Sequence, residues 1–159
     1  MQRSAKAKLD PQAALEARVF VSLMRAADVL ARGAEALLKP YSISGTQYNI
    51  LRILSGAGEK GLACCEVGSR LISRDPDITR LLDRMESRGW ISRARESRDR
   101  RVVKTRISAQ GLRLLDELHK PVRELHRRQL RHLPARQLRQ LSNLLDRARE
   151  PLEEADSCD

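Results

Sequence analysis

The segment Glu96–Arg106 gathers the side chains of this sequence that are best suited to bind a polyanion. It reads ESRDRRVVKTR and holds four Arg and one Lys beside two acidic residues. Guanidinium groups bind phosphate oxygens through paired hydrogen bonds, so the acids need another task. Asp99 is expected to hold and orient a neighbouring guanidinium, that of Arg98, Arg100 or Arg101. The segment is therefore predicted to be a shaped anion-binding loop rather than a diffuse basic patch.

A second set of polar side chains lies along an expected helix that ends at Gly89. Its apolar positions recur on one face, which predicts a core-facing side. On the other side Arg80 can pair with guanine, Thr79 can touch a thymine methyl group or a phosphate, and Asp77 can accept from cytosine. A solvated helix face has the same composition, so this helix alone does not decide the function. The candidate DNA contacts are Arg74, which can reach a phosphate, and Pro76, Asp77, Thr79, Arg80 and Arg84.

The helices that must position these side chains begin near Pro11. A first helix is expected over residues 11–40, after a disordered arm over residues 1–10. Its apolar residues form a seam that predicts packing against another helix. Ser44 and Gln47 have the spacing of a capping box, which predicts a second helix that stops at Gly56. The seam consists of Leu23, Ala27, Leu30, Ala34 and Leu37.

A short helix over residues 63–72 is expected next. The turn that follows makes Asp75 a candidate N-cap of the polar helix, with Pro76 in its first turn and Gly89 as its C′ residue. The segment GAGEKG matches GxGxxG, but a dinucleotide site requires a preceding strand, and here a helix is expected instead. Its glycines are better explained as a helix stop and a tight turn.

Two short strands are expected on either side of the basic loop. Trp90 and Ile91 open the first, and VVKTRI at 102–107 is rich in β-branched residues. Ser108 is expected to cap the helix that follows. A helix, turn, second helix and hairpin in this order predict a winged helix-turn-helix over residues 41–108, in which the basic loop is the wing.

Two more helices are expected over residues 109–153, followed by a tail at 154–159. Pro121 lies within the first and can kink it, and Pro134 marks the break between the two. Their apolar positions again form seams for which the middle of the chain offers no partner. The predicted fold class is therefore mainly α with a small β-hairpin.

Length and composition agree with this class. The chain has 159 residues, 41% of them apolar and 3% aromatic, which suits one domain or two small lobes that share a core. The formal net charge is +10, and residues 93–106 alone carry seven bases and two acids. Such a focused excess favours a nucleic-acid partner over a merely solubilising surface. No apolar run reaches membrane-spanning length, and the basic N-terminus lacks the apolar core of a signal peptide.

The segment 74–111 resembles the MarR (multiple antibiotic resistance regulator) family of bacterial transcription factors. DITRLLDRMESRGWISR (77–93) is similar to the family's recognition helix and first wing strand, and DRRVVKTRISAQG (99–111) to the pattern D-x-R-x-x-x-V-x-L-T-x-x-G. Asp99, Arg101 and Gly111 match this pattern, while Thr105, Ile107 and Ser108 replace Val, Leu and Thr. SGTQYNIL (44–51) also resembles the family, and the layout is similar over about residues 11–152.

The resemblance implies a homodimer whose terminal helices, residues 11–40 and 109–153, intertwine as a dimerisation domain. It implies that Arg101 enters the minor groove and that Asp99 orients it. Each dimer would read a pseudo-palindrome with half-sites about one helical turn, roughly 34 Å, apart. Many members bind small aromatic or phenolic ligands, for which Phe20, Met24, Tyr41 and Tyr48 are the candidates; plain core packing is the alternative reading of these four.

Three cysteines and three histidines complete the residues with chemical potential. Cys64 falls on the core face of its helix and is expected to be buried, although redox sensing through Cys64 or Cys65 stays open. Cys158 lies in the expected tail. The histidines have no metal-ligand spacing, so no metal or cofactor is expected. They are His119, His126 and His132.

The sequence thus predicts a cytoplasmic, homodimeric, sequence-specific repressor that binds double-stranded DNA and can be released by a small ligand. No catalytic residues are recognised, so an enzyme is not expected, and no membrane partner is expected either. The alternatives are an oxidant-sensing regulator that uses Cys64 or Cys65 and a non-specific architectural DNA-binding protein.

Overall fold

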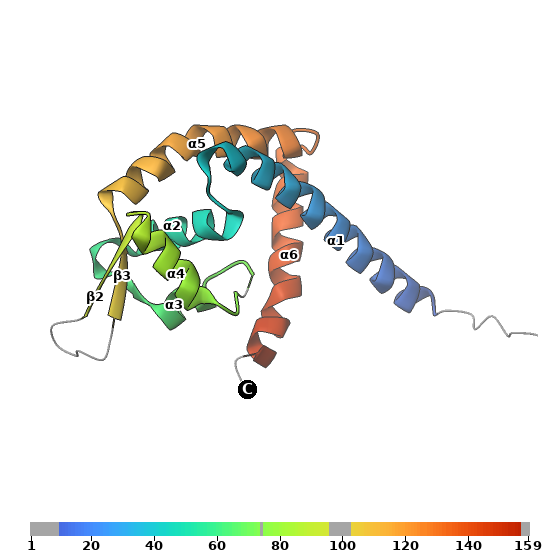
Figure 1. Cartoon of the computed structure of the whole chain (residues 1–159). Coiled ribbons are helices and arrows are strands. Elements are labelled where there is room, and N and C mark those ends of the chain that lie inside the picture. The colour runs from blue at the N-terminus through green and yellow to red at the C-terminus, as the bar shows by residue number, and fades with distance from the viewer. Residues whose placement is uncertain (1–9, 74, 96–102, 157–159) are drawn as a thin grey trace, which may run out of the picture. The chain divides into compact units, whose positions relative to one another are not determined.

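The computed structural model describes residues 10–73, 75–95 and 103–156, the last six by their backbone alone. Helices dominate, and the strands form one small antiparallel sheet (Figure 1), which confirms the predicted class. The elements are α1 (Pro11–Leu38), a 3-10 turn (Lys39–Tyr41), α2 (Gly45–Ala57), a second 3-10 turn (Gly58–Lys60), β1 (Leu62–Ala63), α3 (Cys64–Ser69), α4 (Ile78–Ser87), β2 (Ile91–Arg95), β3 (Val103–Ile107), α5 (Ala109–Leu130) and α6 (Ala135–Asp156).

The chain divides into two compact units at a point inside α5. The first extends to Val122 and the second begins at Arg123. The second unit therefore consists of the end of α5, a turn and α6. Within the described residues, no helix combines the length and the apolar character needed to span a membrane.

The start and end of α1 follow from local chemistry. The Gln12 amide donates to the Asp10 carboxylate at 3.2 Å, and Pro11 occupies the first turn. The α-helix ends at Leu38, and the chain continues as the 3-10 turn Lys39–Tyr41, because Pro40 has no amide to extend the α-helical hydrogen bonds. Leu38 is the only buried residue of this helix; in its apolar seam, Leu23 and Ala27 are exposed, and Leu30, Ala34 and Leu37 are half-buried.

The predicted capping box begins α2. The Gln47 amide donates to the Ser44 hydroxyl at 3.2 Å, and the Ser44 amide donates to the Gln47 side chain at 3.0 Å. The expected stop at Gly56 is wrong, because the helix continues to Ala57 and is capped by Gly58 at φ 60°. A glycine can remain in a helix, whereas the left-handed cap requires one, so Gly58 sets the boundary.

A short third strand, β1, was not expected. Leu62 pairs with Thr105 and Ala63 with Lys104 of β3, so the sheet has the order β1-β3-β2. Two residues are too few to show an alternating pattern in sequence. Gly61, at φ 61°, precedes the strand, and a Cβ atom there would lie 2.7 Å from the Thr105 carbonyl oxygen. In GAGEKG, Gly58 therefore caps a helix and begins a tight turn, as predicted, and Gly61 permits a close backbone approach that was not predicted.

The boundaries of α3 and α4 differ from expectation. The short helix ends at Ser69 rather than near residue 72, and α4 begins at Ile78. Asp75 is not the N-cap: its carboxylate accepts from the Asp77 amide at 2.9 Å and closes a turn before the helix. Pro76 consequently lies in this turn rather than in the first turn of α4.

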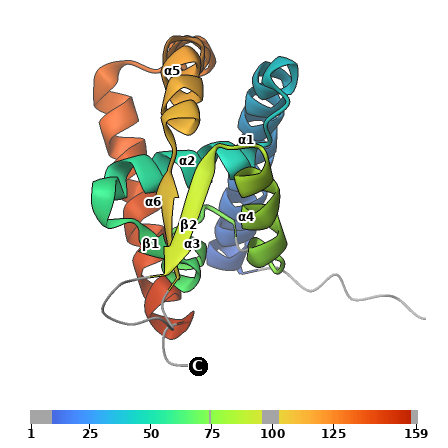
Figure 2. The same cartoon turned by 60° about the vertical axis from the view of Figure 1, so that its left-hand side comes forward.

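The end of α4 leads directly into the hairpin. Gly89 adopts φ 71°, its amide donates to the Glu86 carbonyl at 2.8 Å, and the Trp90 amide donates to the Met85 carbonyl at 3.1 Å. This is a Schellman motif, and it confirms Gly89 as the C′ residue. Strands β2 and β3 then pair in register from Ile91↔Ile107 to Arg95↔Val103, beside α4 (Figure 2).

Ser108 begins α5 as predicted. Its hydroxyl accepts from the Gly111 amide at 3.0 Å and donates to the Gly89 carbonyl at 2.5 Å, so this side chain links the start of α5 to the end of α4. Pro121 lies inside the helix without ending it. The last helix, α6, runs to Asp156 and therefore includes part of the expected tail.

The core of the first unit lies among α2, α3, α4, the sheet and the beginning of α5. Its side chains come from every one of these elements, which fixes their mutual positions. Those with no measurable exposure are Ile50, Leu51, Leu54, Val67, Leu82, Met85 and Leu118.

Candidate nucleic-acid interface

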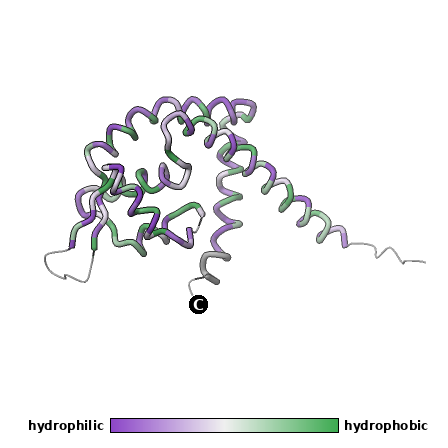
Figure 3. The backbone as a smooth tube through the Cα atoms, in the orientation of Figure 1, coloured by the Kyte–Doolittle hydropathy of each residue, from purple (hydrophilic) through white to green (hydrophobic). Residues whose placement is uncertain are grey.

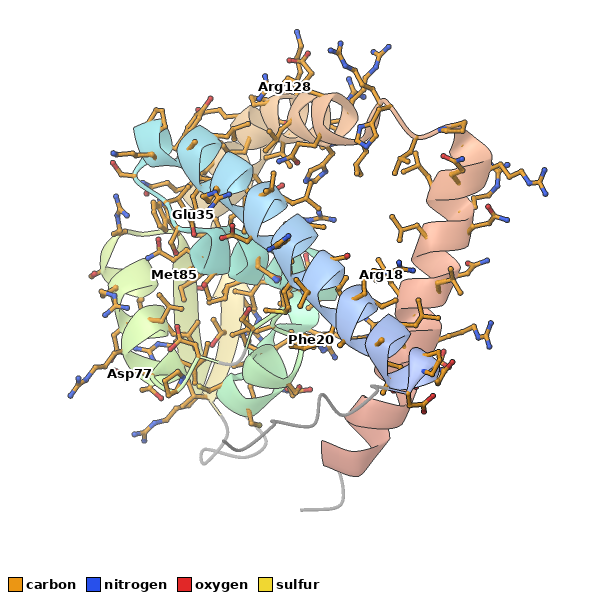
Figure 4. The ribbon with its side chains drawn as sticks, turned by 90° about the vertical axis from the view of Figure 1, so that its right-hand side faces the viewer. Arg18, Phe20, Glu35, Asp77, Met85 and Arg128 are labelled. Carbon is orange, nitrogen blue, oxygen red and sulfur yellow. The ribbon has the colours of Figure 1, made fainter. Side chains whose placement is uncertain are left out.

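The α4 helix has two chemically distinct sides. Leu82 and Met85 are fully buried, and Ile78 packs against the same core. Thr79, Arg80 and Arg84 are exposed on the other side. Figure 4 shows Asp77 at the outer end of this helix and Met85 nearer the middle of the lobe. The division predicted from the sequence is confirmed, and it frees the polar side for a partner.

An ion pair at the start of α4 gives one arginine a defined orientation. The Arg80 guanidinium lies 3.3 Å from the Asp77 carboxylate, and both side chains are largely exposed. Such a pair contributes little stability in water. It does limit the directions in which Arg80 can point, so Asp77 acts first as an orienting group for Arg80. Arg84 forms no ion pair with any residue that the structure describes.

A second charged cluster joins α4 to β2, the first strand of the predicted wing. Arg93 of β2 binds two carboxylates of α4: that of Asp83, and that of Glu86 through its Nε at 2.9 Å. The Arg93 amide also donates to Glu86, at 2.9 Å. Burial by itself would lower the pKa of Arg93, but the hydrogen bonds to Glu86 and Asp83 outweigh it and raise the pKa. The cluster, named here the β2 clamp, fixes the strand against the helix.

The returning strand has a clamp of its own. Glu66 of α3 accepts from the Ala63 amide at 2.6 Å and from the Lys104 ammonium group of β3 at 2.9 Å. Ala63 has no side chain that could cap α3, so Glu66 supplies the cap from inside the helix. The Ala63 amide, then Lys104, lower the pKa of Glu66. This β3 clamp links the wing strand to the first helix of the helix-turn-helix.

Two further arginines of the lobe, Arg88 and Arg106, also bind groups of the lobe itself. Arg88 stacks on Trp90 at 4.1 Å from the ring centre and donates to the Ser42 carbonyl at 2.6 Å. Arg106 donates to the Glu59 carbonyl at 2.7 Å. With Arg93 these residues act inside the lobe, although by sequence they belong to the basic excess. The charge of the lobe is thus partly structural.

The clamp residues were not singled out from the sequence. Asp83 and Glu86 follow each other at a helical spacing of three, which would have identified a shared helix side. Nothing in the sequence, however, indicated that Arg93 would reach both of them. Thr105 was also missed: it is 1% exposed, between β1 and β2, where a β-branched side chain packs well.

The predicted wing residues fall outside the described part of the chain. This holds for Arg74 as well, which precedes α4 in sequence. The strands on either side of the wing are described, and they end at Arg95 and begin again at Val103. The DNA contacts that stay predictions for this reason are those of Arg74, Arg98, Asp99, Arg100 and Arg101.

The four candidate ligand residues lie in different surroundings. Tyr41 and Tyr48 are partly buried and pack against the core. Phe20 and Met24 are 65% and 55% exposed, one turn apart on α1. Figure 4 labels Phe20 on this helix.

The two neighbouring cysteines also differ from each other. Cys64 is half-buried against the core, with its Sγ 3.9 Å from the Thr79 hydroxyl oxygen, while Cys65 is exposed. The predicted burial of Cys64 is thus only partial. No group of three or more His, Cys, Asp or Glu side chains suited to a metal ion occurs in the part of the chain that the structure describes.

The helix pair α3–α4 followed by the β2–β3 hairpin defines a winged helix protein of the DNA-binding kind. A sequence model of the MarR family matches residues 43–103. A solved MarR transcription factor from Planctomyces limnophilus is 34% identical, with a TM-score of 0.65 and coverage of 91% of this chain and 98% of that chain. The transcriptional repressor IacR from Pseudomonas putida is 28% identical over 127 residues, 80% of this chain and 75% of that protein.

The chain belongs to the MarR family and is a DNA-binding transcriptional regulator. The members of this family are regulators and not enzymes. A mutant MarR from E. coli, solved in complex with operator DNA, has a TM-score of 0.75 at 24% identity and covers 82% of this chain and 93% of that chain. At this identity the similarity supports the fold alone.

Proposed function

We propose that the protein is a homodimeric repressor that acts in the cytoplasm and reads a pseudo-palindromic operator. The polar side of α4, with Thr79, Arg80 and Arg84 exposed, is the observation that carries this proposal. In a helix-turn-helix the N-terminal part of the second helix meets base edges in the major groove. The β2 clamp holds the wing strand against that same helix, so both contacts would approach DNA as one rigid body.

The proposed dimer rests on the uncovered apolar side chains of α1 and α6. Figure 3 shows that hydrophobic and hydrophilic residues alternate along both helices. Apolar side chains on α1 and α6 stay between 40% and 65% exposed in the single chain, which a second copy would bury. They include Val19, Phe20, Leu23, Met24, Val29, Leu141, Leu144 and Leu145.

Selection of bound fragments from random DNA tests the proposal. A specific dimer enriches an inverted repeat whose half-sites are about one helical turn apart. An architectural protein enriches no motif and loses its complexes to excess random DNA. The same selection with Arg80→Gln should change the preferred base at one position per half-site. A uniform loss of affinity for all sequences would make Arg80 a phosphate contact instead.

The wing assignment is tested separately. Arg101→Ala should weaken binding to the selected operator by at least about 1 kcal/mol and leave the dimer intact. Unchanged affinity in this variant would remove Arg101, and with it the orienting role of Asp99, from the proposal.

A small effector completes the proposed mechanism. A ligand weakens operator binding only if it prefers dimers whose recognition helices are wrongly spaced. Phe20 and Met24 are the exposed candidates for its site, and Tyr41 and Tyr48 the partly buried ones. Ligands that shift operator affinity in the wild type and lose this effect in Tyr48→Ala would support the assignment.

Oxidation of a cysteine is a second candidate for the signal that regulates operator binding, because the Cys64 thiol lies next to Thr79 of the recognition helix. Peroxide should then reduce operator binding, and Cys64→Ser or Cys65→Ser should abolish the response. If both variants respond to peroxide as the wild type does, regulation through Cys64 or Cys65 is excluded.

A further inference from the structure

The second unit carries a basic surface that the DNA-reading lobe does not include. Residues 125–145 contain five arginines and no Asp or Glu, in a chain that is 33% charged. By comparison, residues 93–106 around the wing mix their bases with two acids. We name this surface the arginine tip; it consists of Arg127, Arg128, Arg131, Arg136 and Arg139.

The tip occupies the turn between two helices. Arg127 and Arg128 belong to the last turn of α5, and Arg136 is the second residue of α6. The Leu133 amide donates to the Leu130 carbonyl at 3.0 Å, which closes the connecting turn. Figure 4 marks Arg128 on α5. The five side chains therefore gather at one end of a helical hairpin.

All five arginines are exposed and have no internal task. None of them forms an ion pair or side-chain hydrogen bond with a residue that the structure describes. Three arginines of the lobe behave differently, since Arg88, Arg93 and Arg106 each bind a carbonyl or a carboxylate.

Helix stability does not explain the whole set. Cations at the end of α5 are favourable, because the carbonyl groups there carry partial negative charge. The start of α6 carries partial positive charge, so Arg136 is unfavourable at that place, and no acid stands in this first turn. Helix stability therefore accounts for the arginines at the end of α5 but not for Arg136 at the start of α6.

The chemistry of the tip fits phosphates of a duplex. Every base in it is Arg, whose planar fork binds phosphate oxygens in pairs. The second unit has no Phe, Tyr or Trp, which disfavours stacking on single-stranded bases. Protein interfaces need an apolar centre, but the leucines of the turn, Leu130, Leu133 and Leu138, are already half-buried. Protein–DNA interfaces are instead polar and strongly basic.

We propose that the arginine tip binds the phosphate backbone of a second duplex, so that the protein can hold two DNA segments at once. The tip lies in the second unit, whereas α4 and the wing strands belong to the first. Contact through the tip is independent of sequence, because phosphates carry no base information. Phosphate binding by the tip goes beyond the operator reading proposed above and does not need it, whereas holding two segments also needs the lobe to bind one duplex.

The test compares two full-length variants of equal charge. The tip variant changes the five tip arginines to Gln, a good helix former. The control variant changes Arg18, Arg25, Arg52, Arg113 and Arg147 to Gln, all of them exposed and outside the tip. Both sets lower the formal net charge from +10 by five, to +5. Helicity and size are compared first, by circular dichroism and gel filtration.

Binding of a labelled random-sequence duplex is then measured against salt in a background that carries Arg80→Gln, Arg84→Gln and Arg101→Gln. These changes weaken the lobe equally in every variant compared, so failure of the operator proposal leaves this measurement intact. The tip variant should lose up to about 4.5 from the slope of log K against log salt per chain, at about 0.9 per phosphate. The control should keep the slope of the background. A variant with only Arg131→Gln and Arg136→Gln should lose about two fifths of the effect.

Capture of a second duplex gives an independent result. Protein held on an immobilised duplex should retain a labelled second duplex in the wild type and the control variant, and lose it in the tip variant. Equal slopes and equal capture in tip and control variants would overturn the proposal, as would no capture in any of the three. Binding of poly-glutamate by the tip in preference to the duplex would also overturn it, in favour of an acidic protein partner.

Discussion

The winged lobe and the long helices use similar apolar residues to opposite effect. In the lobe Leu51, Leu54 and Leu82 are fully buried by their own chain. On α6 Leu144 is 59% exposed, and on α1 Phe20 is 65% exposed. Both regions are amphipathic, yet only the lobe has neighbours that complete its core. The contrast supports the proposal that a second copy of the chain covers the apolar side chains of the long helices, whereas the lobe completes its core by itself.

Charge divides the molecule in a different way. In the lobe, Arg93 and Lys104 are held in clamps that fix β2 against α4 and β3 against α3, whereas the arginine tip leaves all five of its bases exposed. Net charge alone would have treated these regions as equivalent. Paired substitutions at buried and exposed positions test these differences, and the largest expected effect comes first.

The largest effect is expected from a matched leucine pair. Leu82→Ala removes a fully buried side chain and should cost about 2–5 kcal/mol of the free energy of unfolding. Leu144→Ala, at an exposed site, should cost less than about 0.5 kcal/mol in the monomer. Urea unfolding at two protein concentrations measures both. Any larger loss at Leu144 should depend on concentration, and equal, concentration-independent losses at the two sites would break the comparison.

A glycine pair tests the packing inside the lobe. A Cβ at Gly111 would overlap the Trp90 carbonyl oxygen and lie 2.8 Å from Ile107, so Gly111→Ala should cost at least about 2 kcal/mol. Gly68→Ala, with nothing within 4 Å of the added Cβ, should be neutral or stabilising by up to about 1 kcal/mol. Thermal unfolding distinguishes the two. A tolerated alanine at Gly111 would mean that the junction of β2 and α5 is looser than the structure shows.

The β2 clamp is tested by two arginines of one strand. Arg93→Gln leaves Asp83 and Glu86 without their base and should cost about 1–2 kcal/mol of stability. Operator affinity should fall about tenfold, or about 1.4 kcal/mol, because the wing strand loses its anchor on α4. Arg95→Gln removes an exposed base of the same strand and should leave stability within about 0.5 kcal/mol.

Operator affinity, measured without denaturant, shows whether Arg93 positions the wing strand or only contributes a positive charge. Arg93→Lys should restore only part of it, since an ammonium group cannot bind two carboxylates with a planar fork. Equal affinities for the Arg93→Gln and Arg95→Gln variants would show that the clamp does not orient the wing.

The smallest effect is expected at the β3 clamp, and it depends on pH. The pKa of Glu66 lies below its ordinary value of 4.5, so its contribution to stability is present above that pH and is lost as pH falls through the folded value. The difference in unfolding midpoint between wild type and Glu66→Gln should therefore be larger at pH 7 than at pH 3. Glu59→Gln is the control, because Glu59 contributes its backbone carbonyl and not its carboxylate. A difference that does not narrow in acid would remove Glu66 from the clamp.

Much of the fold was predictable because its signals are local. The capping box of Ser44, the C′ glycine Gly89 and the cap at Ser108 each depend on residues within a few positions, and the structure has all three. The start of α4 was misplaced because two aspartates compete there, and the turn closed by Asp75 prevails. Strand β1 was missed because its identity depends on β3, about forty residues further along the chain.

The candidate site was predictable to a lesser extent. The spacing of apolar residues identified which side of α4 faces the core, and hence that Thr79 and Arg80 face outward. The partners of the outward charges were not predictable in the same way. Arg93 meets Glu86 and Lys104 meets Glu66 only because the sheet brings a strand beside each helix.

The sequence by itself determined the order of elements, the polar and apolar sides of the helices and the caps that start them. These features follow from periodicities and hydrogen bonds within single segments. Only the tertiary structure decided which bases are structural and which are free, since Arg93 and Arg127 are alike as residues and differ in their neighbours. The physical reason is that a charge acquires its task from carboxylates and carbonyls brought close by folding, over distances in sequence that no local pattern encodes.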